Sequence, residues 1–140
     1  MKTLTFKANK EFIEDVTDFV TGEMERHNFP AGLHPDILTA VEEIFINITN
    51  YAYPPEQEGD VSISVMVDED TVVLFEDTGK PYNPLERIDP ALDIPLMERE
   101  IGGLGIYFVK NLMDKVEYEH IGGKNTLTIT KSSKPTVGGV

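Results

Sequence analysis

The residue types best suited to chemistry fall on one face of a helix that we expect over residues 35–53, with Pro35 in its first turn. At about 100° per residue, a narrow polar stripe lies opposite apolar positions that include Leu38. The stripe consists of Asp36, Thr39, Glu43, Asn47 and Asn50. Glu43 and Asn47 are one turn apart and point the same way, so a ligand or polar partner on this face would meet a carboxylate and an amide together. The periodicity is equally compatible with a stripe that faces a ligand and with one that faces only water.

A glycine-rich helix start provides a second element of a site. Gly102-Gly103-Leu104-Gly105 comes directly before an apolar helical run over residues 106–114. Glycines leave backbone N–H groups open to close approach, and the positive end of a helix attracts phosphate. No Gly-Lys-Ser/Thr follows, so the segment is not a Walker A loop, and it does not follow a strand as a dinucleotide fingerprint would. Taken alone, the glycines fit the binding of phosphate and the anchoring of a flexible lid equally well.

A third element follows a strand that we expect over residues 71–76. Asp77-Thr78-Gly79 places a carboxylate at the end of this strand, where it could accept a hydrogen bond from an exocyclic amine such as that of adenine. Gly79 would let a flat base approach the backbone. An ordinary turn also uses Asp-x-Gly. The three elements together predict a site for Mg-ATP.

The order of the remaining elements predicts the fold class. We expect a strand over residues 2–7 and an amphipathic helix over residues 10–28. Two hairpins follow, one from strands 60–67 and 71–76 and one from strands 115–120 and 125–131. Residues 78–101 are expected to form a long loop of the kind that serves as a lid or binding loop. Hairpins rather than strand-helix alternation favour an α+β fold, a two-layer α/β sandwich with helices on one face of a mostly antiparallel sheet. The ATP-binding domain is expected over residues 1–131, followed by a flexible tail over 132–140.

Composition and charge exclude several classes of function. The chain of 140 residues carries 12 Lys and Arg against 25 Asp and Glu, a net charge of −13, which disfavours nucleic acid as a partner. A phosphate ligand would therefore need local N–H donors and a divalent cation. The chain has no cysteine and therefore no disulfide or thiolate site. No segment has the roughly 20 apolar residues of a membrane span or the apolar core of a signal peptide, so we expect a cytoplasmic protein without a membrane partner.

In this order and at these intervals, the three motifs resemble those of the Bergerat-fold (GHKL) ATPases of gyrase, Hsp90 and histidine kinases. The resemblance covers most of residues 1–131. The runs EEIFINITNYAYP, DTGKPYNP and GGLGIYFVKNLMD further resemble the anti-sigma-factor serine kinases of bacterial partner-switching systems. The resemblance implies a histidine kinase-like ATPase domain that uses ATP and Mg²⁺ to phosphorylate a serine of a small antagonist protein and that regulates a sigma factor or similar partner. It also implies a homodimer.

The resemblance implies a role for each matching residue. Glu43 would be the general base, Asn47 would bind Mg²⁺ through its amide oxygen, and Asp77 would hold adenine. Gly79 would line the base. The phosphates would be contacted by Gly102, Gly103, Leu104, Gly105 and Arg99, with Lys80 and Lys110 as weaker alternatives to Arg99.

Three positions depart from the pattern. Pro81 replaces a second glycine after Asp77, which stiffens that turn and could change the shape of the base pocket. Asn50 stands where histidine kinases carry a basic residue. Lys124-Asn125 replaces a late Gly-Thr pair, which leaves Asn125 or Thr126 as the polar contact.

Three alternatives accompany the kinase hypothesis. The first is a catalytically silent ATP-binding module that switches partners by nucleotide state. The second is the ATP-binding half of a histidine kinase, which the absence of a preceding helix with a phosphoacceptor histidine disfavours. The third is a nucleotide-free α+β domain, for which Mg-ATP would produce no thermal shift.

Overall fold

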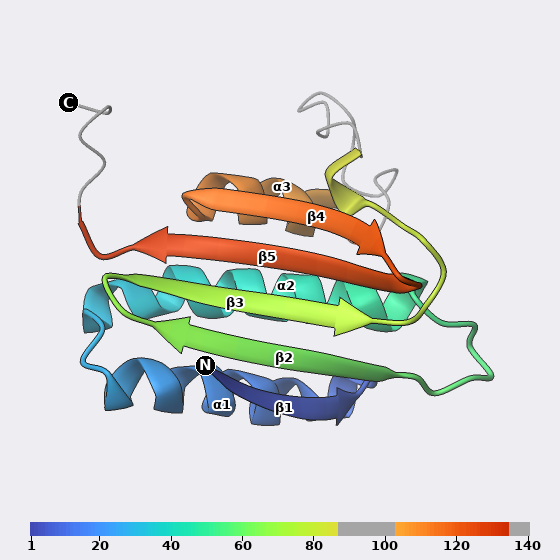
Figure 1. The fold of residues 1–140 in the computed structure, drawn as a ribbon, viewed down its shortest axis with the longest axis horizontal. Helices are drawn as coiled ribbons and strands as arrows, with labels where there is room; N and C mark the ends of the chain where they lie inside the picture. The colour runs from blue at the N-terminus through green and yellow to red at the C-terminus, as the bar shows by residue number, and fades with distance from the viewer. Residues whose placement is uncertain (87–102, 135–140) are drawn as a thin grey trace.

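The sheet has five strands, and the helices cover one of its faces. A computed structural model describes residues 1–86 and 103–134. Its elements are β1 (Lys2–Lys7), η1 (Lys10–Phe12), α1 (Ile13–Arg26), η2 (Ala31–Leu33), α2 (His34–Tyr51), β2 (Asp60–Val67), β3 (Asp70–Asp77), η3 (Pro84–Glu86), α3 (Gly103–Leu112), β4 (Lys115–Ile121) and β5 (Lys124–Ser132). The strand order is β1-β2-β3-β5-β4 with every neighbouring pair antiparallel, and α1, α2 and α3 lie behind the sheet in Figure 1. The predicted α+β two-layer sandwich is confirmed.

Local signals explain where η1 begins and where α2 begins and ends. Asn9 caps η1, because its side-chain oxygen accepts a hydrogen bond from the Glu11 N–H at 3.0 Å. α2 carries Pro35 in its first turn and ends at Tyr51, shortly before Pro54. Within the part of the chain that the structure describes, none of the helices is long and apolar enough to cross a membrane.

α2 is the central helix, since it contacts both α1 and α3. This packing buries a wider arc of α2 than the sequence predicts. Ile37 and Ala40, each of which directly follows a residue of the polar stripe in the sequence, are fully buried, whereas Leu38, expected on the apolar face, is only partly buried. Along the polar stripe, Thr39 is exposed and Asn47 is buried. The stripe therefore faces water at its start and the protein interior near its end.

Strand alternation decides which polar residues point toward the helices. On β3 and β5 every second residue is buried against the helix layer; these residues are Thr71, Val73, Phe75 and Asp77 on β3, and Asn125, Leu127 and Ile129 on β5. Asp77 and Asn125 therefore continue an inner face that is otherwise largely apolar. A carboxylate and an amide placed there need specific partners.

Candidate nucleotide-binding site

Asp77 and Asn125 form the polar floor of the candidate site. They are direct partners in the β3–β5 register, and each side chain is only 6% exposed. The Asn125 amide nitrogen donates to Asp77 Oδ1 at 2.9 Å, and the Gly79 N–H donates to the same oxygen at 2.9 Å. Within the described residues, Asp77 Oδ2 accepts no hydrogen bond. One carboxylate oxygen is thus held by the protein while the other remains open to an external donor.

Gly79 is required by the close approach of two backbone segments. A Cβ at this position would lie 2.1 Å from the carbonyl oxygen of Ala52 at the end of α2. The Lys80 N–H donates to that same oxygen at 2.9 Å. Nearby, the Tyr53 hydroxyl donates to the Asp60 carbonyl at 2.7 Å and accepts from the Thr78 N–H at 3.1 Å. These contacts fix the segment after β3 against α2 and so fix the rim of the site.

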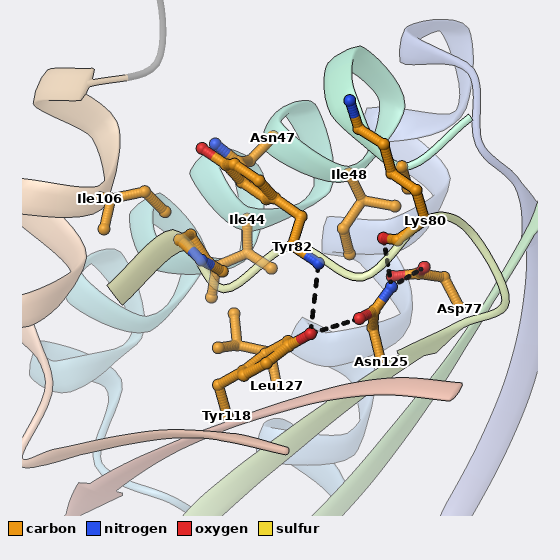
Figure 2. A pocket seen from close by; sticks show the side chains of 12 residues that line it. Ile44, Asn47, Ile48, Asp77, Lys80, Tyr82, Ile106, Tyr118, Asn125 and Leu127 are labelled. Atoms are coloured by element: carbon orange, nitrogen blue, oxygen red, sulfur yellow. Dashed lines mark hydrogen bonds between the residues drawn. The ribbon is translucent and has the colours of Figure 1, made fainter. Parts of the chain in front are cut away.

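A pocket opens between α2, α3 and the strands β3, β4 and β5. Figure 2 shows the side chains around it; they belong to Ile44, Asn47, Ile48, Ala52, Asp77, Lys80, Tyr82, Pro84, Ile106, Tyr118, Asn125 and Leu127. The Tyr82 ring stacks on Tyr51, with ring centroids 5.5 Å apart and planes inclined by 26°. Apolar walls, an aromatic ring and a few convergent polar atoms suit a flat heteroaromatic ligand.

Asn47 is the unsatisfied polar group of this pocket. Its side chain is 5% exposed, and its amide nitrogen is buried without a hydrogen-bond partner among the described residues. The other such atom in that part of the chain, Thr71 Oγ1, belongs to the opposite end of β3. An unpaired buried amide costs about 1–3 kcal/mol. A phosphate oxygen could accept from this nitrogen and Mg²⁺ could bind the amide oxygen, so the residue fits Mg-ATP.

Glu43 lies one turn before Asn47, against the first turn of α3. A Cβ at Gly105 would lie 2.2 Å from Glu43 Oε2, so only glycine allows this contact without displacing the carboxylate. Burial raises the pKa of Glu43 above its usual value, and the neighbouring Glu42 charge adds to the increase. Partial desolvation and a raised pKa make this carboxylate a better proton acceptor.

The structure brings together some of the predicted site residues and separates others. Gly103 and Leu104 belong to the first turn of α3, with Gly105 beside Glu43. Asn50 lines a separate groove with Tyr53 and Gly79 rather than the pocket. Thr126 is on the opposite face of β5 from Asn125, so β5 turns it away from the pocket. Arg99 and Gly102 are outside the described residues.

Sequence reasoning missed Tyr118, which donates a hydrogen bond from its hydroxyl to Asn125 Oδ1. It also missed Tyr82, whose ring lines the pocket. A signal for Tyr118 was present, because β4 and β5 form a tight hairpin in which Tyr118 pairs directly with the inward-facing Leu127. Within the described residues, no group of three or more His, Cys, Asp or Glu side chains could hold a metal ion.

Two curated proteins show how closely the chain is related to known kinases. The serine-protein kinase RsbW of Halalkalibacterium halodurans is 30% identical over 135 residues, which cover 91% of this chain and 80% of that protein. The serine/threonine-protein kinase BtrW of Bordetella bronchiseptica is 26% identical over 111 residues, which cover 79% of this chain and 78% of that protein.

Solved structures share the fold. The RsbU and RsbW domains of a Mycobacterium tuberculosis protein match with a TM-score of 0.61 at 15% identity, covering 94% of this chain and 32% of that one. The catalytic domain of the histidine kinase ThkA matches with a TM-score of 0.55 at 15% identity, covering 97% and 100%. The family model described as histidine kinase-like ATPase domain matches residues 6–131. The chain therefore belongs to the histidine kinase-like ATPase domain family, as the resemblance of its three motifs predicted.

Proposed function

We propose that this chain is an ATP-dependent protein serine kinase that phosphorylates a small antagonist protein and, in alternation, binds a sigma factor or similar regulator. The observation that carries the proposal is the placement of Glu43, a partly desolvated carboxylate held against the start of α3 and one turn from the unpaired amide of Asn47. The relatives named serine-protein kinases support the same reaction class.

Each residue has a defined part in the proposed reaction. Asp77 accepts a hydrogen bond from the adenine amine, and Asn47 with the backbone N–H groups at the start of α3 holds the phosphates. Mg²⁺, when bound at Asn47, would neutralise part of the phosphate charge. Glu43 accepts the proton of the substrate serine hydroxyl. The serine oxygen then forms a bond to the γ-phosphorus as the bond to the β-phosphate oxygen breaks, which releases ADP and phosphoserine.

A phosphoryl-transfer assay with radiolabelled ATP and candidate antagonist proteins from the same organism tests the proposal. Glu43→Gln removes the proton acceptor and should lower the transfer rate by about 10²- to 10⁴-fold while leaving ATP binding intact. Glu25→Gln is the matched control, because Glu25 is an exposed carboxylate on α1 and does not line the pocket. Absence of label on any serine, or full activity of Glu43→Gln, would contradict the kinase role.

The same assay separates the kinase from its rival, the silent ATP-binding module. The base pocket around Asp77 and Asn125 does not include Glu43, so ATP could bind without phosphoryl transfer. The rival predicts nucleotide-dependent binding of the regulator that Glu43→Gln leaves unchanged, with no labelled product from the wild-type protein.

The role of Asn47 is tested by thermal denaturation with ATP in Mg²⁺ or in EDTA. A ligand at 100 times its Kd adds about 2.7 kcal/mol to the free energy of unfolding. The extra stabilisation that Mg²⁺ gives to the wild-type protein should disappear in Asn47→Ala and persist in Asn50→Ala, whose side chain lines the separate groove. Equal responses of the two variants to Mg²⁺ would remove Asn47 from the metal site.

A further inference from the structure

A chain of hydrogen bonds runs from the segment after β3 through β4 and β5 to Asp77. The Tyr82 N–H donates to the Tyr118 hydroxyl at 3.3 Å, and that hydroxyl donates to Asn125 Oδ1. The Asn125 amide nitrogen then donates to Asp77 Oδ1 at 2.9 Å and to the Lys80 carbonyl at 3.0 Å. Figure 2 shows these bonds crossing the floor of the pocket from Tyr118 to Asp77.

The chain of bonds fixes the orientation of the Asn125 amide. Its nitrogen faces three acceptors, the Asp77 carboxylate and, at 3.0 and 3.4 Å, the carbonyls of Lys80 and Gly79. Its oxygen faces the hydroxyl donor of Tyr118. A flipped amide would place its oxygen against the Asp77 carboxylate and its nitrogen against Tyr118. Because two acceptors in contact repel and these bonds would be lost, only the observed orientation satisfies all partners.

The orientation of Asn125 in turn fixes the carboxylate of Asp77. Oδ1 is occupied by two donors, the Gly79 N–H and the Asn125 amide, and the side chain is buried. Rotation of the carboxylate would break both bonds in a site with little access to water, where lost hydrogen bonds are costly. Oδ2 therefore keeps one position at the pocket, where it can accept a hydrogen bond but cannot donate one.

We propose that Tyr118 and Asn125 are positioning residues that orient Asp77 to select purines carrying a 6-amino group. This inference deepens the proposed ATP binding and rests on it. Adenine presents an N–H donor at its 6-position, which Oδ2 accepts. Guanine presents a carbonyl oxygen there, and a fixed carboxylate oxygen facing that acceptor disfavours binding.

A merely structural role predicts a different outcome. If Tyr118 and Asn125 only tie β4 and β5 to the segment after β3, removing the Tyr118 hydroxyl weakens the binding of all nucleotides equally. A role in orienting Asp77 weakens only those nucleotides that carry the 6-amino group. The measurement that separates the two roles is the Kd for purine riboside triphosphate, which lacks that group, divided by the Kd for ATP.

The decisive variant is Tyr118→Phe, which keeps the ring and removes the hydroxyl. The wild-type protein should bind ATP at least tenfold more tightly than purine riboside triphosphate, because a hydrogen bond to a charged group contributes about 1.5–3 kcal/mol. Tyr118→Phe should raise the Kd for ATP by about 2- to 12-fold and leave the Kd for the analogue unchanged. Asn125→Leu, similar in size but without polar atoms, should reduce the ratio further.

Thr128→Val is the matched control, because Thr128 is on β5 but on the face turned away from the helices; its ratio should equal that of the wild-type protein. If Asn125→Leu does not fold, Tyr118→Phe alone decides. An unchanged ratio in Tyr118→Phe, or equal wild-type affinities for ATP and the analogue, would overturn the inference. Failure of the kinase proposal gives a different result: the wild-type protein would show these binding ratios but would transfer no phosphoryl group.

Discussion

Replacing Gly105 with alanine should separate stability from phosphoryl transfer. The added Cβ would lie 2.2 Å from Glu43 Oε2, whereas real Cβ atoms essentially never come closer than 3.0 Å and make ordinary contact from 3.4 Å. The carboxylate must therefore move by 0.8–1.2 Å. The fold itself should tolerate this change, because the displaced oxygen is the far end of a flexible side chain. A displacement of about 1 Å at a reacting group can cost about 10²-fold in rate.

Gly105→Ala should accordingly show a transfer rate lower by about 100-fold and a free energy of unfolding equal to or slightly above that of the wild-type protein. Gly22→Ala is the matched control, since Gly22 is also helical and a Cβ there would meet nothing within 4 Å. It should gain about 0.5–1 kcal/mol and keep full activity. Labelled-ATP transfer and urea denaturation measure the two properties. Full transfer by Gly105→Ala would refute the reasoning, and lost ATP binding would assign Gly105 to the phosphates instead of to Glu43.

Three further predictions follow from the same contacts. The raised pKa of Glu43 means that its contribution to stability is fully present below the unfolded pKa of 4.5 and is lost as pH rises through the folded pKa. Glu43→Gln should therefore raise the melting temperature at pH 7 but not at pH 4, and a gain independent of pH would count against this. Gly79→Ala should lower the free energy of unfolding by about 1–3 kcal/mol and weaken ATP binding, because its Cβ would lie 2.1 Å from the Ala52 carbonyl oxygen; chemical denaturation and titration check both. Thr126→Val should leave the Kd for ATP unchanged, and a weaker affinity would show that Thr126 reaches the nucleotide.

The secondary structure was largely predictable because its patterns are local. The expected strand over residues 71–76 lies within the observed β3, because its β-branched and aromatic residues favour an extended chain. Which residues of α2 are fully buried was not predictable in this way. Leu38 is as apolar as Ile37, and only packing against both α1 and α3 determines which of them is fully buried.

The site was predictable where it depends on spacing along one element. The motif comparison left Asn125 and Thr126 open, although the alternation of Leu127 and Ile129 with threonines is a signal that could have separated them. The contact between Glu43 and Gly105 could not be read from the sequence, because it depends on how closely α2 approaches α3. The β4–β5 hairpin pairs Tyr118 with Leu127, but the bond from the Tyr118 hydroxyl to Asn125 depends on the orientation of two side chains, which spacing along the sequence does not determine.

Three polar side chains in and beside the pocket suit the binding of a ligand better than the stability of the unliganded protein. Asn47 keeps a buried amide nitrogen without a partner, Glu43 keeps a carboxylate whose ionised form burial disfavours, and Asp77 keeps one oxygen without a donor from the described residues. The first two cost free energy in the unliganded protein, since leucine in place of Asn47 or glutamine in place of Glu43 would remove the penalty. The three groups differ in what they require: a phosphate oxygen for the amide, a hydroxyl proton for Glu43, and an amine for Asp77. In the proposed reaction, ATP with an attacking serine would supply all three, at and beside one pocket, in a chain whose net charge of −13 opposes any phosphate.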